Sequence, residues 1–328
     1  MPLSRRHLLA SGLVLSGTGV LAACSSQSCS PLTIGLTYTP NIQFAPIYMA
    51  RKNSKYASGV SLRHHGAQEG LFDALLSGKE QLVVAGADEA VVAASNGSNL
   101  VVVGGYYQSY PACLIVPESS PIKTPADLKG KTVGTPGRKG ETWYALQLAM
   151  DTASLSESDL TIQDIGYTQQ AALVGGKVDA VVGFSNNDAV QIKQAGTAVR
   201  TIQPSESIPL IGVSLVTTRK LLDSRREDLQ AAVKASVEGM TAFVKDPDAA
   251  VEATKEYVQD LVESTQAANA REVAVATGKL VSGEGKAAVG SVRVDDFTPM
   301  IEFLASHKIL GDKKTPKAAD VCVPLTGN

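Results

Sequence analysis

The sequence predicts an α/β protein of two lobes, in which parallel-rich sheets are flanked by helices. From residue 32 to residue 202, short apolar runs alternate with segments whose apolar residues recur at helical spacing. Such alternation is typical of strand–helix–strand units with parallel strands. It is interrupted by Pro117-Glu-Ser-Ser-Pro121, which separates a first series from a second. Two series of this kind indicate two lobes.

The stretch of residues 32–50 shows the pattern most clearly. An apolar run at 32–36 is followed by the turn Tyr38-Thr-Pro-Asn41 and then by apolar residues at helical spacing, which begin with Phe44. In open α/β sheets, ligands bind at the carboxyl ends of the strands, beside unpaired N–H groups at helix starts. We therefore expect Tyr38, Asn41 and Phe44 at a ligand-binding edge. Taken alone, the stretch also fits an ordinary strand–turn–helix unit.

The other elements follow from the same patterns. In the first series we expect strands at 60–65, 81–85, 100–106 and 112–116 and helices at 68–76 and 88–95. In the second we expect strands at 132–135, 160–165, 180–184 and 198–202 and helices at 141–150, 169–174 and 187–194. A strand at 210–217 is expected to return to the first lobe. Apolar stripes predict helices at 229–244, 247–261, 267–280 and 297–305.

The first residues are typical of an export signal. Arg5 and Arg6 precede an apolar stretch at 8–21 without acidic residues, and Leu21-Ala-Ala-Cys24 follows. This ending resembles the bacterial lipobox, which implies a signal peptide at 1–23, a lipid on Cys24 that attaches the chain to the membrane, and a tether at 24–30. The paired arginines resemble a twin-arginine signal, and ordinary positive charge in a Sec signal explains them equally well.

The composition is that of a globular protein. About 300 residues remain after the signal, enough for two domains. A net charge of -2 gives no basic excess for nucleic acid, and no second apolar span indicates a channel. Cys113 lies in an apolar run and is expected to be a buried small hydrophobe. A bridge between Cys29 and Cys322 is an open alternative, and no cofactor is indicated.

Polar side chains follow the strands of the first series. His65 and Glu69 come after the second strand, Asp88 after the third, and Tyr107 lies between the last two. Adjacent strand residues point to opposite faces, so at most one of His64 and His65 faces a cleft, and no metal site is expected. A helix cap explains Asp88 as well as ligand contact does.

The second series has two polar loops at strand ends. The first loop contains Gly137, Glu141, Thr142 and Trp143 and fits neither the Walker nor the Gly-x-Gly-x-x-Gly pattern. We interpret it as a backbone nest that presents N–H donors to a polar or anionic edge, with Trp143 either in the core or stacked on a ligand. The second loop is a set of donors and acceptors, namely Phe184, Ser185, Asn186 and Asn187.

The sequence lacks a recognisable catalytic set. It contains no Gly-x-Ser-x-Gly, His-Glu-x-x-His or Cys-x-x-Cys motif. The histidines are His7, His64, His65 and His307, and none stands in a pattern with a nucleophile. Binding is therefore favoured over catalysis.

Four segments together resemble one family. They are the lipobox and the stretches at 38–48, 126–134 and 176–184. The family is that of solute-binding proteins related to thiamine-pyrimidine synthases, which feed ABC importers. The resemblance implies a type II periplasmic-binding-protein fold with lobe 1 at 31–115 plus 214–328 and lobe 2 at 116–213. It also implies a two-strand hinge near Ile115-Val116 and Val213-Ser214.

The resemblance implies partners as well. They are a small heteroaromatic ligand and the permease and ATPase subunits of an ABC transporter, with the protein acting as a monomer at the extracytoplasmic face. The related synthases carry a histidine in the helix at 88–93 and a Cys-rich loop near 210–217. Both are missing here, so synthase activity is not expected, although an enzyme of pyrimidine synthesis is the alternative reading of the fold.

The first loop departs from the family pattern. Members that bind the thiamine pyrimidine carry Trp-x-x-Asn-x-x-His there. Asn41 matches, whereas Tyr38 replaces the Trp and Phe44 replaces the His.

The second loop departs as well. The family pattern is Gly-Phe-Trp-Asn-x-Glu, in which Phe184 and Asn186 match, whereas Ser185 replaces the Trp and Asp188 the Glu. Loss of large aromatic walls favours a wider, polar-edged ring, so riboflavin is preferred slightly over a thiamine pyrimidine. Alkanesulfonate- or nitrate-type ligands come third.

Overall fold

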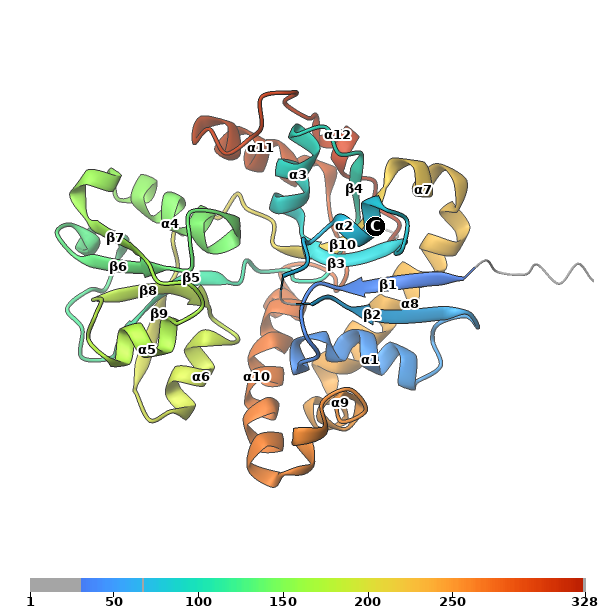
Figure 1. The fold of residues 1–328 in the computed structure, drawn as a ribbon, viewed down its shortest axis with the longest axis horizontal. Coiled ribbons are helices and arrows are strands. Elements are labelled where there is room, and N and C mark those ends of the chain that lie inside the picture. The colour runs from blue at the N-terminus through green and yellow to red at the C-terminus, as the bar shows by residue number, and fades with distance from the viewer. Residues whose placement is uncertain (1–30, 67, 327–328) are drawn as a thin grey trace, which may run out of the picture.

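The computed structural model describes residues 31–66 and 68–326, which form two lobes side by side (Figure 1). The predicted signal at 1–23 lies outside the described residues, as does the tether at 24–30, which contains Cys24 and Cys29. In the described part of the chain, no helix combines the length and the apolar character needed to cross a membrane.

The first lobe is built on a five-stranded sheet in the order β2-β1-β3-β10-β4. The strands are β1 (Leu32–Leu36), β2 (Val60–His64), β3 (Leu82–Gly86), β4 (Leu100–Gly105) and β10 (Val213–Thr218). β1 pairs in parallel with β2 and β3, whereas β10 runs antiparallel to β3 and β4. The carboxyl ends of β1, β2 and β3 therefore share one edge.

The second lobe repeats this arrangement in the order β7-β6-β8-β5-β9. Its strands are β5 (Ala112–Pro117), β6 (Thr132–Thr135), β7 (Thr161–Asp164), β8 (Ala180–Phe184) and β9 (Val199–Ile202). β6 is parallel to β7 and β8, and β5 is antiparallel to β8 and β9. These two parallel-rich sheets confirm the predicted fold class.

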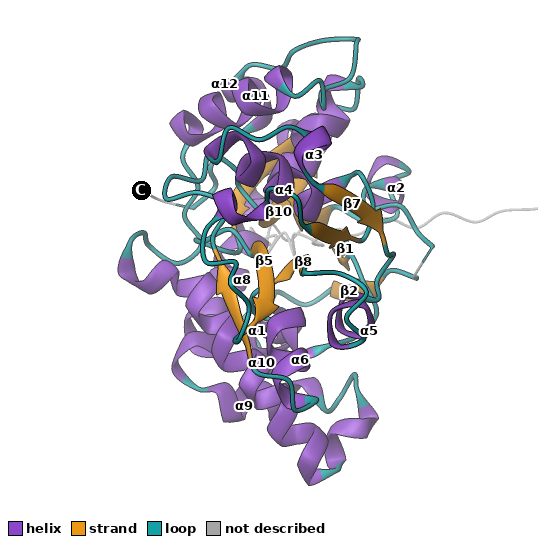
Figure 2. Ribbon diagram, turned by 90° about the vertical axis from the view of Figure 1, so that its left-hand side faces the viewer, coloured by secondary structure: helices purple, strands orange, loops and turns teal. Residues whose placement is uncertain are grey.

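Helices cover both faces of each sheet. In the first lobe, α1 (Ala45–Lys52), α8 (Arg226–Lys245), α9 (Pro247–Thr254) and α10 (Ser264–Ser282) lie on one side. On the other side lie α2 (Asp73–Leu76), α3 (Ala87–Ser95), α11 (Phe297–Ser306) and α12 (Ala318–Val321), while α7 (Arg219–Ser224) follows β10. In the second lobe α4 (Gly140–Thr152) lies on one face and α5 (Gln169–Val174) and α6 (Asp188–Gln194) on the other (Figure 2).

The alternating side chains of β5 show how the second sheet is packed. Leu114 and Val116 join the apolar cluster that includes α4, whereas Cys113 and Ile115 face the cluster of α5 and α6. All four are buried, as a strand covered on both faces requires. Cys113 is thus the buried small hydrophobe that its sequence context predicted, and both Cys113 and Cys322 are free thiols.

The structure corrects the expected position of the first crossing between the lobes. β5 lies wholly in the second sheet, because its residues pair with β8 and β9, whereas we assigned residues up to 115 to the first lobe. The chain therefore crosses at 106–111, before the predicted Ile115-Val116, and crosses back at 203–212. The apolar run of β5 indicated burial but carried no mark of which sheet it joins.

Three predicted elements are shorter than expected. Residues 68–72 form turns, and α2 begins only at Asp73. The helix expected at 247–261 ends at Thr254, and a 3-10 turn at 259–262 follows. β10 begins at Val213 because the carbonyls of Ile211 and Gly212 accept the N–H groups of Asp88 and Ala87, at the start of α3, and so do not enter the ladder.

Candidate ligand-binding edge between the lobes

The polar loops of the two lobes meet where the parallel strands end. α3 follows β3 in the first lobe and contacts α4, which follows β6 in the second; α10 of the first lobe contacts α6, which follows β8. The first crossing, at 106–111, runs between these contacts (Figure 1). This is the edge at which open α/β sheets bind ligands.

Asn186 is the most buried side chain of the loop after β8, with 1% of its surface exposed. Its amide nitrogen donates to Thr277 Oγ1 at 2.9 Å and lies 3.4 Å from Tyr107 Oη. Its Oδ1 atom is buried and has no hydrogen-bond partner. Asn186 therefore joins the second lobe to α10 and to the first crossing and leaves one acceptor unused.

The loop that carries Asn186 is fixed by its neighbours. The N–H of Phe184 donates to Asp188 Oδ2 at 2.7 Å, and the N–H of Ser185 donates to the carbonyl of Pro111 at 2.9 Å. Asn187 accepts a hydrogen bond from Gln191 within α6. Because these bonds tie the loop to both α6 and the crossing, the Asn186 side chain is directed into the space between the lobes.

Three carboxyl groups gather at the starts of α3 and α4. A Cβ placed on Gly86 would lie 2.7, 2.8 and 3.2 Å from one oxygen of Asp88, Glu89 and Glu141, so the three groups surround one point. Glu141 Oε1 would also lie 3.0 Å from a Cβ on Gly212. A side chain at position 86 or 212 would meet the Glu141 carboxyl. Glycine at both positions therefore lets this carboxyl lie against the two backbone segments.

Burial raises the pKa of each of these carboxyl groups. It raises the pKa of Asp88 to about 7, although Tyr110 Oη donates to Asp88 Oδ2 at 2.7 Å. Burial and the nearby Asp88 raise the pKa of Glu89 to about 8, while Lys139 opposes that shift. Burial, followed by the charges of Asp88 and Glu89, holds the pKa of Glu141 well above its ordinary range. Glu141 Oε1 is buried without a partner.

The aromatic candidates differ in exposure. Trp143 is buried in the large apolar cluster, with the Arg138 guanidinium 5.3 Å from its ring centroid, which favours the core-packing interpretation. Phe44 is buried, with its ring edge-on to His64 at 6.1 Å. Tyr38 is 54% exposed after β1.

Two further candidates serve the backbone around them. Asn41 caps the turn before α1, because its Oδ1 accepts from the N–H of Gln43 and its amide nitrogen donates to the carbonyl of Thr39, both at 2.8 Å. Gly137 supplies a carbonyl that accepts from Thr135 Oγ1, and Thr142 is buried in the first turn of α4.

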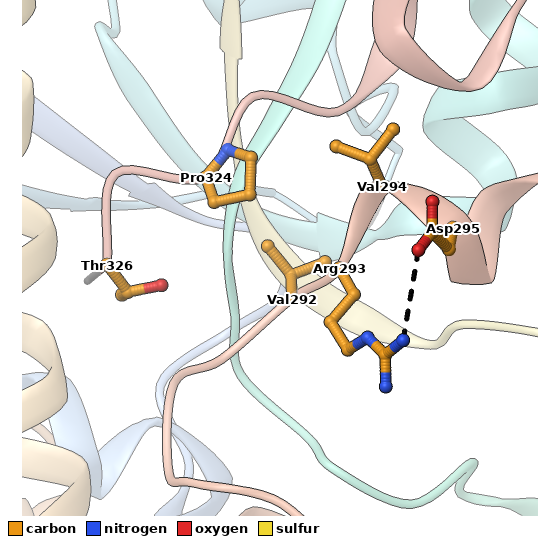
Figure 3. Close-up of a pocket in the computed structure, with 6 residues that line it drawn as sticks. All are labelled: Val292, Arg293, Val294, Asp295, Pro324 and Thr326. Carbon is orange, nitrogen blue, oxygen red and sulfur yellow. Dashed lines mark ion pairs between the residues drawn. The ribbon is translucent and has the colours of Figure 1, made fainter. Parts of the chain in front are cut away.

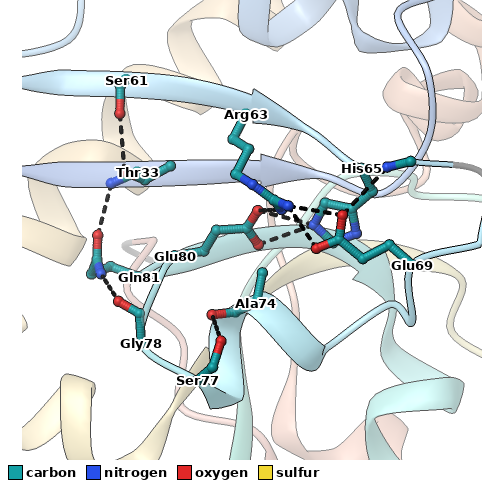
Figure 4. A network of polar contacts seen from close by, with 11 residues as sticks. Thr33, Ser61, Arg63, His65, Glu69, Ala74, Ser77, Gly78, Glu80 and Gln81 are labelled. Carbon is teal, nitrogen blue, oxygen red and sulfur yellow. Dashed lines mark hydrogen bonds and ion pairs between the residues drawn. The ribbon is translucent and has the colours of Figure 1, made fainter.

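His65 and Glu69 belong to an ionic network in the first lobe (Figure 4). Arg63 donates to Glu69 and to Glu80, each at 2.7 Å, and His65 Nε2 lies 3.0 Å from Glu80. Glu80 is fully buried, and its Oε2 would lie 2.0 Å from a Cβ on Gly35 in β1. The network accounts for both residues structurally, and ligand contact by either stays a prediction.

The structure thus gathers some candidates and separates others. Asp88 and Glu141 come together at Tyr110, and Asn186 lies beside Tyr107 on the same crossing, whereas His65 and Glu69 are held by Arg63 and Glu80. Sequence reasoning missed Thr277 as a member of the interlobe group and Glu80 as the centre of the ionic network. Thr277 lies in an apolar helical stripe 91 residues after Asn186 and carries no local signal.

Other concave regions lie away from this edge. A cavity of about 500 Å³ on the first lobe is lined by Val292, Arg293, Val294, Asp295, Pro324 and Thr326, none of them a predicted site residue (Figure 3). Within residues 31–66 and 68–326, no group of three or more His, Cys, Asp and Glu side chains is arranged to hold a metal ion.

Two relatives and a solved structure are similar to this chain. Over 249 residues the chain is 28% identical to the riboflavin-binding protein RibY of Chloroflexus aurantiacus, covering 74% of this chain and 71% of that one. It is 23% identical over 250 residues to a formylaminopyrimidine-binding protein of Halalkalibacterium halodurans, covering 74% and 76%. The fold resembles the periplasmic aliphatic sulphonate binding protein SsuA of Escherichia coli, with a TM-score of 0.69, 19% identity and coverage of 88% and 91%.

The fold defines a class, the proteins of the periplasmic-binding-protein fold, and both relatives named here are binding proteins. The chain belongs to the NMT1/THI5-like family, whose model matches residues 41–250. The predicted resemblance is thereby confirmed.

Proposed function

We propose that this protein captures a small heteroaromatic vitamin or vitamin precursor, and that riboflavin is its ligand in preference to a thiamine pyrimidine. The observation that carries the proposal is the buried group between the lobes, where Asn186 meets Tyr107 and Thr277. Such a group sits where a ligand would contact both lobes at once, and its polar atoms can fix the edge of a flat ring.

Two features support riboflavin over the pyrimidine. The relative named for riboflavin is 28% identical, against 23% for the one named for formylaminopyrimidine. In the loop after β8, Ser185 also stands where pyrimidine-binding members carry tryptophan, which leaves space for a wider ring. The pyrimidine remains the second candidate, because it too has a named relative over three quarters of this chain.

The setting of the protein completes the proposal. It is held at the extracytoplasmic face by a lipid on Cys24, works as a monomer and delivers its ligand to the permease and ATPase of an ABC importer. Export by the Sec or the twin-arginine route fits the first residues. The chain segments at 106–111 and 203–212 act as the hinge, so that ligand shifts the lobes toward a closed state.

The test is a fluorescence titration. Riboflavin fluorescence is followed while the purified protein is added, and formylaminopyrimidine is then added as a competitor. We expect saturable quenching with one site per chain and only weak competition. Tighter binding of the pyrimidine would make it the ligand. No binding of either compound would overturn the assignment to a heteroaromatic vitamin.

A further inference from the structure

Buried polar atoms without partners are concentrated at the interlobe edge. In the described part of the chain, three buried side-chain nitrogen or oxygen atoms lack a hydrogen bond, and two of them are Glu141 Oε1 and Asn186 Oδ1. Native proteins pair nearly all such atoms, so each exception requires a reason. Asn186 Oδ1 is an acceptor, and Glu141 Oε1 is one whenever the carboxyl proton is absent or lies on the other oxygen. The two residues come from the segments that follow two different strands of the second lobe.

The two atoms belong to one site. Asn186 lies 3.4 Å from Tyr107 Oη, on the first crossing. A Cβ on Gly212 would lie 3.0 Å from Glu141 Oε1 and 2.8 Å from Pro111, whose carbonyl accepts the N–H of Ser185 beside Asn186 at 2.9 Å. Glu141 and Asn186 are both more than nine-tenths buried. Both unpaired atoms therefore lie beside the first crossing, at 106–111.

The surroundings of Glu141 disfavour a negative charge. The first turns of α3 and α4 carry Asp88, Glu89 and Glu141, and Asp88 Oδ1 already accepts the N–H of Glu89 at 2.7 Å. A helix start usually attracts an anion, but here its own carboxyl groups occupy that position. The pKa of Asp88 is about 7, so this carboxyl is partly ionised at neutral pH, and an anionic ligand would force it to take up a proton, which costs free energy.

We infer that Glu141 Oε1 and Asn186 Oδ1 each accept a hydrogen bond from an N–H or O–H donor of the ligand, and that this pair selects a neutral or cationic ligand over an anion. This inference rests on the proposed capture of a small heteroaromatic compound. Riboflavin offers an imide N–H and several hydroxyls, and an aminopyrimidine offers an amino group, whereas a sulfonate has no donor for either atom.

The experiment compares five variants by calorimetric titration with riboflavin, 4-amino-5-hydroxymethyl-2-methylpyrimidine and ethanesulfonate. Glu141→Ala removes one acceptor and should weaken the bound vitamin-type probe about tenfold or more. Asn186→Ala removes the other acceptor together with the bond to Thr277, so it should weaken binding clearly more than Thr277→Val, which removes that bond alone. Glu141→Gln keeps a carbonyl acceptor and should lose no more than about threefold. Glu302→Gln is the matched control, because this glutamate is exposed on α11, away from the edge.

The outcomes separate the inference from the proposed function. If riboflavin or the pyrimidine binds and Glu141→Ala and Asn186→Ala bind it as well as wild type, the function stands and the inference is overturned. If ethanesulfonate binds wild type, the exclusion of anions is overturned. If no probe binds, native mass spectrometry of the protein isolated from its host gives the mass of the natural ligand. A natural ligand with fewer than two N–H or O–H donors would overturn the inference. A natural ligand with two or more such donors would support the inference, while riboflavin and the pyrimidine would be ruled out as the ligand. Circular dichroism of each variant checks that it is folded.

Discussion

The amide nitrogen of Asn186 lies 2.9 Å from the hydroxyl oxygen of Thr277, and this hydrogen bond joins the second lobe to α10 of the first. Both side chains are buried. A second bond of the same kind runs from Gln194 of α6 to the carbonyl of Asn269, in α10, at 3.0 Å. We expect contacts of this type to break when the lobes separate, so they should favour the closed state that the proposed function requires.

Thr277→Val should weaken that closed state. The variant keeps the shape of the side chain and removes the acceptor for Asn186. One such bond contributes about 0.5–1.5 kcal/mol, so ligand affinity should fall about two- to tenfold, and small-angle scattering of the unliganded variant should give a larger radius of gyration. Thr241→Val is the control, because that hydroxyl bonds only within α8. Unchanged affinity and scattering would mean that the bond does not hold the lobes together.

The raised pKa values at the edge predict a pH dependence of stability. The pKa of Asp88 is about 7 and that of Glu89 about 8 in the folded protein, above the ordinary values near 4 that apply when the chain is unfolded. The folded state therefore holds protons that the unfolded state has lost. The resulting stabilisation is complete below about pH 4 and is lost as pH rises through 7 and 8.

Glu89→Gln removes one of these groups and tests that sign. The Tm of the variant minus that of wild type should rise between pH 5 and pH 8.5, by about 2 °C or more. Differential scanning fluorimetry at closely spaced pH values measures it. The difference for Glu302→Gln should stay flat over the same range. A Glu89→Gln difference that is equally flat, or that falls with pH, would contradict the raised pKa.

The effects of substitutions at Gly35 and at Glu80 on stability should depend strongly on each other. A Cβ on Gly35 would lie 2.0 Å from Glu80 Oε2, so Gly35→Ala should destabilise the protein by about 1–3 kcal/mol. Glu80→Ala should cost about 3 kcal/mol, because it leaves Arg63 and His65 without their shared carboxylate.

The double variant is the decisive measurement in urea unfolding. Since Glu80→Ala removes the atom that Gly35→Ala meets, the double variant should lose less stability than the two single variants together. Gly66→Ala is the control, because a Cβ there meets nothing within 4 Å. Additive losses would show that Gly35 is required for another reason.

Much of the fold could be predicted because local signals agreed. β1, β6, α5 and β8 have the predicted bounds, since each run is bounded by turn residues or by a change of period. The predicted lobe boundary after residue 115 divides β5, because an apolar run indicates burial on both faces and not the partner strands. Pairing is a non-local property that one sequence does not display.

The candidate site was predictable only in part for a similar reason. Asn186 follows the carboxyl end of β8, so its place at the edge follows from the topology of parallel sheets. The role of Glu80 could not be predicted, because it depends on a glycine 45 positions earlier in the chain and on a histidine that sequence reasoning assigned to the ligand. Burial of a carboxylate beneath a neighbouring strand leaves no periodic pattern.

Cys24→Ala tests the proposed lipid anchor. If Leu21-Ala-Ala-Cys24 is a lipobox, the variant should lose lipid labelling, and the chain should move from the membrane fraction to the soluble fraction. Immunoblots of both fractions from the expressing host measure this. Cys113→Ser is unsuitable as a control because that thiol is buried, so Ser26→Ala, beyond the predicted cleavage point, serves instead. A Cys24→Ala chain that stays in the membrane fraction with its lipid label would show that the anchor was misread.

Ser185→Trp tests the proposed preference for a wide ring. Ser185 is half-buried beside Asn186, in a loop whose backbone is fixed by Pro111 and Asp188. Because that backbone cannot easily move, a tryptophan at 185 should narrow the space between the lobes and exclude a tricyclic ligand by steric overlap. We expect riboflavin to lose at least about tenfold in affinity and formylaminopyrimidine to lose much less or to gain.

Ser185→Ala is the matched control. It removes the hydroxyl without adding bulk and should bind riboflavin within about threefold of wild type, since a net loss of one exposed hydrogen bond is small. If the Trp variant binds riboflavin as tightly as wild type, Ser185 does not line the site, and the preference for riboflavin loses its structural basis.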